Sequence, residues 1–318
     1  MPRSLSHLAR KALPVSLAAA TALAGLLSLT PANAATGGAS QATADHPCGV
    51  SPRADAPGHY AHVIWIVMEN KSLSQVVGSS DSPFLNQLGS ECGIATNYTA
   101  ISHPSLPNYI AMTSGSVQGI TDDNNPSAHP LNVPSIFSQL GGGWRSLDGS
   151  MKTNCEQTND GLYAVRHNPA TYYTNIRTMC DQRDIPLTDN SNLTQDLSAR
   201  FTFITPDVCD DEHNDCTGTG VPGELQTGDQ FLASFVPKLI NSPEYQSGST
   251  AIFITYDEGE DATNKVFTAV IAPTVTPGTV SDTPFSHFSL LRTTEQMLHL
   301  PFLEGAASAA SMRNDFGI

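Results

Sequence analysis

Short apolar runs rich in β-branched residues alternate with helical patterns along most of this chain. The clearest run, His62 to Met68, reads HVIWIVM, and similar runs span Phe201 to Thr205, Ala251 to Tyr256 and Val266 to Ala272. Apolar runs of this length without polar alternation are typical of strands buried on both faces of a parallel sheet. The four runs therefore predict central strands of such a sheet.

Between these strands lie segments with helical patterns. They are Ser82 to Leu88, Pro107 to Thr113, Ser135 to Leu140, Asp229 to Ile240 and Leu290 to Leu298. Strands that alternate with helices predict an α/β fold, in which a mostly parallel central sheet carries helices on both faces. No internal repeat is visible.

The N-terminal segment has the pattern of a secretory signal. A basic start precedes an apolar stretch from Val15 to Leu29, and small residues precede an expected cut after Ala34. We expect residues 1–34 to be this signal and the protein to be secreted. Residues 35–58 are small and polar, which predicts a loose N-terminal arm, and 59–318 are expected to form a single domain.

The cysteine count agrees with export. Six cysteines are an even number, and in an exported chain they predict three disulfides out of 15 possible connectivities. We expect each cysteine to pair with its neighbour along the chain. No C-x-x-C pair is present, which argues against a cysteine metal site. The cysteines are Cys48, Cys92, Cys155, Cys180, Cys209 and Cys216.

The chain is strongly acidic, with a formal net charge of −15 from 15 Lys and Arg against 30 Asp and Glu. Such a charge repels nucleic acid and anionic membranes. We expect no nucleic-acid partner and no stable membrane insertion, and we expect a monomer. Solubility outside the cell explains the acidity more simply than steering of a ligand.

Polar side chains follow two of the predicted strands where each strand ends. Glu69 and Asn70 follow the first strand, and Asp257 and Glu258 follow the strand that ends at Tyr256. Ligand sites in open α/β sheets form at the carboxyl ends of strands, and oxygen-rich clusters suit hard divalent cations. The pattern predicts a divalent metal site that favours Ca²⁺ or Mg²⁺, with Zn²⁺ as an alternative, although acidic loops are also common without an ion.

A serine precedes the helix that is expected from Pro107. Ser105 in SHPSLPNY would lie at a helix N-terminus, where free N–H groups and the dipole favour a phosphate and a developing alkoxide. The alternative is that Ser105 is only an N-cap. The segment has no G-x-S-x-G motif, which disfavours an α/β-hydrolase esterase.

Further candidate groups lie after the run that ends at Thr205 and before the last helix. Asp211 and His213 belong to the first group, and His287 to the second. A carboxylate and imidazoles there could bind a second metal or protonate a leaving group. A loop histidine is otherwise usually a solvated polar residue.

Several motifs together resemble those of one family. HVIWIVMENKS, SHPSLPNYIAMTSG, YAVRHNP, FITPDVCDDEHND, TYDEGED and SHFSLLRTTEQMLHLP follow one another from about residue 60 to residue 302. In this order they resemble the phosphoesterase family of bacterial phospholipases C and secreted acid phosphatases, which belongs to the alkaline-phosphatase-like superfamily. The resemblance implies a single alkaline-phosphatase-like domain over most of the mature chain.

The resemblance also implies roles for individual residues. Ser105, rather than Ser102, is the implied nucleophile. The implied metal ligands are Glu69, Asn70, Asp257 and Glu258. The implied lining of the phosphate site is His103, Asn108, His167, Asp211, His213 and His287. The chain departs from the family pattern at Glu258, where relatives often carry Asp or His, and at Leu106, where close relatives carry Glu. Tyr109, where sulfatases carry arginine, argues against sulfatase activity.

The sequence thus predicts a metal-dependent acid phosphatase that acts on phosphomonoesters, phosphoinositides among them, through a phosphoserine. Its expected partner is a small phosphorylated substrate or a phospholipid head group. Phospholipase C, which cleaves a diester, is the nearest alternative. A non-catalytic protein that binds phosphate or a lipid head group is the alternative from another class.

Overall fold

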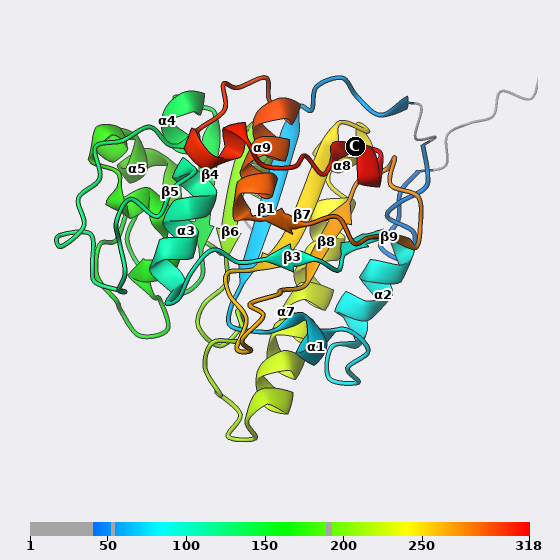
Figure 1. The fold of residues 1–318 in the computed structure, drawn as a ribbon, viewed down its shortest axis with the longest axis horizontal. Helices are drawn as coiled ribbons and strands as arrows, with labels where there is room; N and C mark the ends of the chain where they lie inside the picture. Colours follow the sequence, from blue (N-terminus) through cyan, green and yellow to red (C-terminus); the bar gives the residue numbers. More distant parts are fainter. Residues whose placement is uncertain (1–40, 52–54, 189–192) are drawn as a thin grey trace, which may run out of the picture. The chain divides into compact units, whose positions relative to one another are not determined.

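The apolar run HVIWIVM forms a central strand of an eight-stranded sheet (Figure 1). The structure is a computed structural model that describes residues 41–51, 55–188 and 193–318. Strand β1 (His62–Met68) is buried along its whole length after His62, because neighbouring strands flank it and helices cover both of its faces. The predicted α/β fold with a mostly parallel sheet is confirmed.

The first five strands across the sheet are parallel and end at the same edge. In spatial order the strands are β5 (Asp184–Pro186), β4 (Trp144–Asp148), β6 (Phe201–Thr205), β1, β7 (Thr250–Tyr256), β8 (Thr268–Ile271), β2 (Gly93–Ala95) and β9 (Thr279–Ser281). Strand β8 runs antiparallel to both of its neighbours. The short strands β3 (Tyr98–Thr99) and β10 (Phe285–Ser286) form a separate parallel pair.

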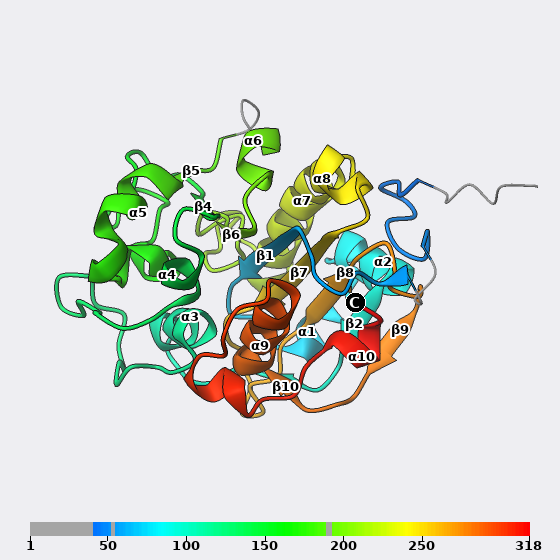
Figure 2. The same cartoon turned by 90° about the horizontal axis from the view of Figure 1, so that it is seen from above.

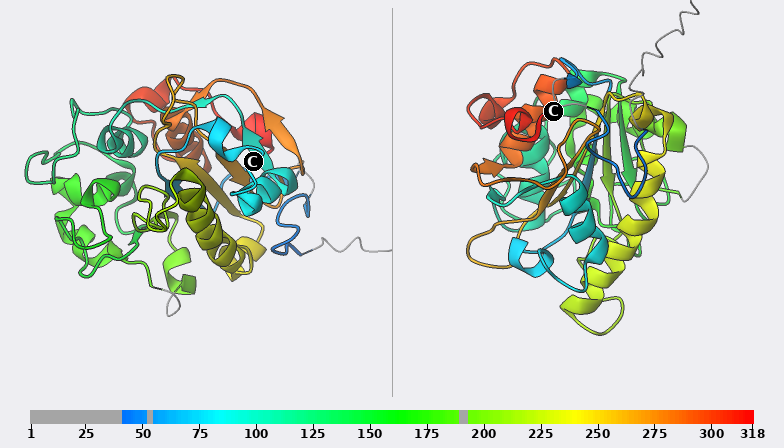
Figure 3. Two further views of the ribbon diagram at one scale, coloured as in Figure 1. Left: turned by 90° about the horizontal axis from the view of Figure 1, so that it is seen from below. Right: turned by 90° about the vertical axis from the view of Figure 1, so that its right-hand side faces the viewer.

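Helices cover both faces of the sheet (Figure 2). Helices α3, α4 and α9 lie on one face, and α2, α7 and α8 lie on the other. The right-hand view of Figure 3 shows the long helix α7 and helix α9 on opposite sides. The helices are α1 (Leu73–Val76), α2 (Pro83–Glu91), α3 (Ser105–Ser114), α4 (Ile136–Leu140), α5 (Arg177–Arg183), α6 (Leu193–Leu197), α7 (Val221–Ile240), α8 (Pro243–Gln246), α9 (His287–Met297) and α10 (Arg313–Phe316).

The five predicted helices are present, and three of them start earlier than the pattern indicates, among them α9, which begins at His287 rather than Leu290. Helix α7 begins at Val221 rather than Asp229, and α3 begins at Ser105 rather than Pro107. Short 3₁₀ turns fill the segment before α5, at Val165–His167, Pro169–Tyr172 and Thr174–Ile176. Another lies at Glu304–Ala307.

Three disulfides join neighbouring cysteines, so the expected pairing is confirmed. They are Cys48–Cys92, Cys155–Cys180 and Cys209–Cys216. The first anchors the N-terminal arm to the end of α2, and the Tyr245 hydroxyl donates to the Pro47 carbonyl at 2.8 Å. Residues Ala39–Ile318 form one compact unit. The expected signal, residues 1–34, lies outside the described residues.

Within the described part of the chain, no helix is both long and apolar enough to span a bilayer.

Candidate active site

The register between β1 and β7 brings the two predicted pairs of polar residues together. Met68 lies opposite Tyr256, so the residues that follow, Glu69 and Asp257, leave the sheet side by side. The Asp257 N–H donates to the Met68 carbonyl at 3.0 Å and extends the pairing by one step. Both carboxylates are fully buried. A hydrogen bond of 2.8 Å from the Glu69 N–H to the Asp211 carbonyl adds the loop after β6 to this edge.

Ser105 is the first residue of α3 and directs its hydroxyl toward the same edge. Pro104 occupies the N-cap position, so Ser105 is not the cap of this helix. Its Oγ donates to Glu69 Oε2 at 3.1 Å, and the residue is only 3% exposed. A serine hydroxyl that bonds to a buried carboxylate at a helix N-terminus has the geometry of an activated nucleophile.

The Glu69 carboxylate lies at the centre of the polar contacts. Tyr109 Oη donates to Glu69 Oε1 at 2.5 Å, and Asn70 Nδ2 donates to Oε2 at 3.3 Å. Burial raises the pKa of Glu69 well above its usual value, and the charges of Asp257 and Asp211 add to the rise. Three buried carboxylates that repel one another need a cation nearby if all are to be ionised.

Asp257 has one satisfied and one unsatisfied oxygen. Its Oδ1 accepts from the N–H groups of Asn70 at 3.1 Å and Glu258 at 2.7 Å, whereas Oδ2 is buried and has no hydrogen-bond partner among the described residues. Burial raises the pKa of Asp257 to about 7, although hydrogen bonds from the Asn70 and Glu258 N–H groups oppose the rise. A divalent cation would satisfy the second oxygen.

Glu258 contacts His103 at the solvent-exposed side of the site. The His103 Nδ1 and Glu258 Oε2 atoms are 2.5 Å apart, and the His103 side chain is 55% exposed. Burial raises the pKa of Glu258 to about 9, with further contributions from the charges of Asp257 and Asp123. His103 is thus an imidazole that solvent and a substrate can reach.

His167 faces Glu69 with a nitrogen that makes no hydrogen bond. Its Nδ1 is 3.1 Å from Asp211 Oδ2, and its ring stacks on Tyr109 with centroids 5.4 Å apart. Its Nε2 lies 3.3 Å from Glu69 Oε1 without a hydrogen bond. Burial lowers the pKa of His167 well below its usual value, and Arg166 and His213 lower it further. A neutral imidazole that donates from Nδ1 turns its Nε2 lone pair toward a carboxylate, an arrangement that a bound cation stabilises.

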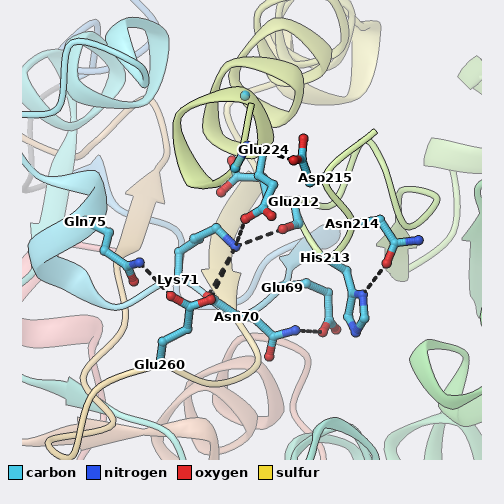
Figure 4. Close-up of polar contacts among 12 residues, drawn as sticks. Glu69, Asn70, Lys71, Gln75, Glu212, His213, Asn214, Asp215, Glu224 and Glu260 are labelled. Carbon is cyan, nitrogen blue, oxygen red and sulfur yellow. Dashed lines mark hydrogen bonds and ion pairs between the residues drawn. The ribbon is translucent and has the colours of Figure 1, made fainter. Parts of the chain in front are cut away.

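His213 completes a group of possible ligands with Glu69 and His167. One ligand atom from each of the three lies within 4.8 Å of the others. The Arg166 Nη2 atom is 2.9 Å from His213 Nε2, and Asn214 Oδ1 is 2.8 Å from His213 Nδ1 (Figure 4). Since arginine only donates, Nε2 is the acceptor and Nδ1 carries the proton. In this arrangement Arg166 occupies the Nε2 lone pair of His213, so the donors that fit a divalent ion are Glu69, the second oxygen of Asp257 and His167 Nε2.

Asn108 and His287, which were expected to line the phosphate site, contact the backbone of loops at the site. Asn108 accepts from the N–H groups of Ile101 and Ser102 and donates to the Ser102 and Pro104 carbonyls. These four hydrogen bonds hold the backbone of its own loop. His287 is fully buried and its Nε2 donates to the Asp257 carbonyl at 2.6 Å.

The other nitrogen of His287, Nδ1, is 3.0 Å from the Tyr98 hydroxyl. Burial lowers the pKa of His287 to about 4. With both ring nitrogens occupied, His287 is placed to orient Asp257. Asn108 and His287 thus contact the backbone of the loops that carry Ser105 and Asp257.

The N-terminus of α3 already holds a carboxylate. The Leu106 N–H, which follows the proposed nucleophile, donates to Asp123 Oδ1 at 2.9 Å. The dipole and free N–H groups at this position favour an anion, which the sequence analysis expected to be a phosphate. Asp123 comes from an exposed segment after α3 and was not expected at the site.

Sequence reasoning missed Tyr109, Arg166, Lys71 and Asp123. Tyr109 is four residues after Ser105 in α3, so helical spacing places it on the same face and could have revealed it. Arg166 precedes His167 in a block that had been recognised. Lys71 and Asp123 reach the site through contacts between distant segments, for which a single sequence carries no signal.

The model of the Phosphoesterase family matches residues 79–301. The chain belongs to the Phosphoesterase family. Its match includes Ser105, His167, His213 and Asp257, whereas Glu69 and Asn70 precede the matched residues.

Named relatives of this family member are phosphatases. The chain is 26% identical over 266 residues to the phosphatidylinositol-3-phosphatase of Mycobacterium tuberculosis, with 81% of this chain and 83% of that protein covered. It is 28% identical over 258 residues to a probable acid phosphatase of Kluyveromyces lactis, with 75% and 58% covered. A phosphate-repressible acid phosphatase of Penicillium chrysogenum is 29% identical over 237 residues, with 69% and 55% covered. The chain thus spans little more than half the length of these two fungal relatives.

Solved structures share the fold at low identity. A phosphonate monoester hydrolase from Silicibacter pomeroyi has a TM-score of 0.53 at 13% identity, with 81% of this chain and 76% of that chain covered. A protein in the alkaline phosphatase superfamily from Vibrio parahaemolyticus has a TM-score of 0.52 at 12% identity, with 81% and 72% covered. The fold is therefore alkaline-phosphatase-like.

Proposed function

We propose that this chain is a secreted, metal-dependent phosphatase that hydrolyses phosphomonoesters through a phosphoserine at Ser105. The observation that carries the proposal is the buried Ser105 hydroxyl, which donates to Glu69 beside an unsatisfied oxygen of Asp257. The names of the family relatives, acid phosphatase and phosphatidylinositol-3-phosphatase, support the reaction class. Three disulfides support an oxidising, extracellular location.

The residues that would hold the divalent ion are those at the shared edge. Glu69, Asn70, Asp257 and Glu258 offer oxygen atoms, which favour Ca²⁺ or Mg²⁺. His167 Nε2 adds a nitrogen atom to the same group, and His213 Nε2 would add another if Arg166 released it, which widens the choice to transition metals such as Zn²⁺. When bound, the ion would lower the pKa of the serine hydroxyl and offset the negative charge of the phosphate and carboxylates.

In the proposed reaction, Ser105 Oγ forms a bond to phosphorus while the bond to the leaving alcohol oxygen breaks. Glu69 Oε2 accepts the hydroxyl proton along the existing hydrogen bond of 3.1 Å. His103, which is exposed at the mouth of the site, gives a proton to the leaving oxygen. A water oxygen then forms a bond to phosphorus while the bond to Ser105 Oγ breaks. His103 takes a proton from this water and Glu69 returns its proton to Oγ, which releases phosphate and restores the Ser105 hydroxyl.

The remaining polar residues hold these groups in place. The Tyr109 hydroxyl fixes the Glu69 carboxylate, and Asp211 orients the His167 ring. Arg166 supplies a guanidinium for the equatorial phosphoryl oxygens. A phosphoinositide with an exposed monoester phosphate is one member of the proposed substrate class.

The experiment compares wild type with Ser105→Ala and the matched control Ser102→Ala. Ser102 is a half-buried residue of the same loop, and its hydroxyl donates to the His103 carbonyl at 3.1 Å. Hydrolysis of p-nitrophenyl phosphate, bis(p-nitrophenyl) phosphate and phosphatidylcholine is measured with and without EDTA. We expect Ser105→Ala and EDTA each to lower monoesterase kcat by at least about 10³-fold, and Ser102→Ala to leave it within about threefold.

Other results would change the assignment. Cleavage of the diester or phosphatidylcholine without monoesterase activity would assign the chain to the phospholipases C. Absence of turnover for all three substrates in the wild type would assign it a phosphate-binding role.

A further inference from the structure

Lys71 is a buried cation whose ammonium group is fully satisfied (Figure 4). Its Nζ lies 3.0 Å from Glu224 Oε2 and donates to the carbonyls of Glu212 at 2.8 Å and Asn70 at 3.3 Å. Glu260 Oε1 is a more distant neighbour at 3.9 Å. The three near contacts match the three N–H donors of an ammonium group. They link the loops after β1 and β6 to the first turn of α7.

The two carbonyls that Lys71 binds belong to residues in left-handed backbone conformations. Asn70 has φ +53° and Glu212 has φ +77°. This conformation is uncommon for residues other than glycine and is strained, so it persists only where the surroundings enforce it. A single buried ammonium group therefore binds both turns at the residues where the backbone is strained.

Each turn directs side chains of the proposed ion site. Asn70 follows Glu69 directly, and Glu212 lies between Asp211 and His213. A change in either turn would rotate these neighbours, because a side chain's direction follows the backbone dihedrals of its own and adjacent residues. The chain thus couples two ligand-bearing loops through one residue that does not itself reach the substrate.

The far side of the Glu212 turn is also fixed. The Tyr256 hydroxyl donates to Glu212 Oε2 at 3.0 Å from the end of β7. Helix α7 packs so closely that a Cβ on Gly228 would lie 2.3 Å from Glu212 Cγ. Glu212 is therefore held by Tyr256 and α7 at its side chain and by Lys71 at its carbonyl.

We propose that Lys71 is a positioning residue that holds these two turns and so sets the affinity of the site for its divalent ion. This inference rests on the proposed function, which requires such an ion. A buried ion pair by itself is weak evidence of stabilisation, because apolar residues often replace such pairs without loss of stability. What distinguishes Lys71 is that its donors bind the carbonyls of the two strained turns.

The test measures Mn²⁺ binding rather than activity alone. Purified full chains of wild type, Lys71→Met and the control Lys238→Met are stripped of metal and titrated with Mn²⁺ by calorimetry, with near-UV circular dichroism and Tm as checks of folding. Lys238 lies in the last turn of α7, so the control removes a lysine side chain from the helix whose first turn carries Glu224. We expect Lys71→Met to bind Mn²⁺ about 10–100-fold more weakly, the usual range for residues that orient ligands.

A second measurement separates positioning from general damage. If Lys71 acts through the ligands, saturating Mn²⁺ restores most of the kcat of Lys71→Met, whereas a residue that contacts the transition state would leave kcat low at any metal concentration. If Lys71→Met does not fold, Lys71→Arg and Glu224→Gln take its place, and both are expected to weaken Mn²⁺ binding.

Two failures can be told apart. Equal Mn²⁺ affinity in wild type and a folded Lys71→Met, or in both substitute variants, would overturn the inference and leave the proposed function intact. Absence of Mn²⁺ binding by the wild type, together with activity that resists EDTA, would overturn the metal dependence of the proposed function and the inference with it.

Discussion

Arg166 places a guanidinium group beside the carboxylates of the site. Its Nη2 donates to His213, and its positive charge opposes the rise in the pKa of Glu69 and Asp211 that burial and neighbouring carboxylates cause. The same charge would attract a phosphoryl group at Ser105. A phosphomonoester dianion carries one more negative charge than a diester, so it gains more from a nearby cation.

Arg166→Gln is therefore expected to impair monoester hydrolysis selectively. We expect kcat/KM for p-nitrophenyl phosphate to fall by about 10²–10³-fold, the range for loss of a donor that stabilises transition-state charge, and kcat/KM for any residual diesterase activity to fall less. Arg183→Gln, at the end of α5, is the control and should match wild type. Equal losses for both esters would contradict a role for Arg166 in recognising the monoester charge.

At this scale, the sequence predicted residues that follow a strand or precede a helix. Glu69, Asp257 and Ser105 carry such local signals, and the structure brings them into contact. The roles of Asn108 and His287 were harder to predict, because a motif names a residue but not the direction of its side chain. The proposed positioning role of Lys71 could not be predicted, because it depends on contacts with strained turns, one of which is distant in the sequence.

Strands β4 and β5 place two buried carboxyl groups next to each other. Asp148 accepts from Ser146 Oγ at 2.9 Å, and the Asn168 amide donates to Asp184 at 2.9 Å. Burial raises the pKa of Asp184 to about 6, and burial followed by the charge of Asp184 raises the pKa of Asp148 well above its usual value. Such a pair stabilises the fold when it is protonated and loses this contribution as pH rises through the folded pKa values.

The pair should make the fold more stable in mild acid than in base. Its contribution to the free energy of unfolding is complete below about pH 4, the pKa of aspartate in the unfolded chain. The contribution declines as the pH rises from there through about 6, the pKa of Asp184 in the folded chain. The rise of the Asp184 pKa from 3.8 to about 6 corresponds to about 3 kcal/mol in the free energy of unfolding. We expect the free energy of unfolding in urea to fall more from pH 5 to pH 8 in wild type than in Asp148→Asn, by about 1–3 kcal/mol.

Asp282→Asn is the control for this measurement, because Asp282 is exposed. It should keep the pH dependence of wild type. The other buried carboxylates remain in both variants, so their contributions cancel in the comparison. If the Asp148→Asn curve is parallel to that of wild type, the pair does not set the pH dependence.

Among elements, sequence patterns identified the strands that are apolar throughout. Strand β4 was missed because WRSLD carries Arg145, Ser146 and Asp148, which look like loop residues until their partners are known. Arg145 Nε lies 3.0 Å from Asp196 Oδ1, and Ser146 donates to Asp148, so these polar groups are satisfied within the fold. The antiparallel direction of β8 also could not be predicted, since the same apolar run suits either direction.

The whole molecule assembles its site from loops at one edge of the parallel strands, with α3 adding Ser105 from one face of the sheet. Alternation of strands and helices predicted that architecture, and the comparisons place it in the Phosphoesterase family. The acidic net charge of −15 gives no hint that the site handles an anion. Binding of an anion depends on the cationic groups close to the site, and the net charge of the whole chain does not show where those groups lie.

The most direct test of the proposed function is acid-quenched peptide mass spectrometry during turnover of a phosphomonoester. We expect one added phosphoryl group on the tryptic peptide that contains Ser105, formed by wild type and Ser102→Ala and absent from Ser105→Ala and from samples treated with EDTA. Phosphorylation of a histidine or of Ser102 would contradict Ser105 as nucleophile. Rapid turnover with no phosphorylated peptide under any quench condition would contradict the phosphoserine route itself.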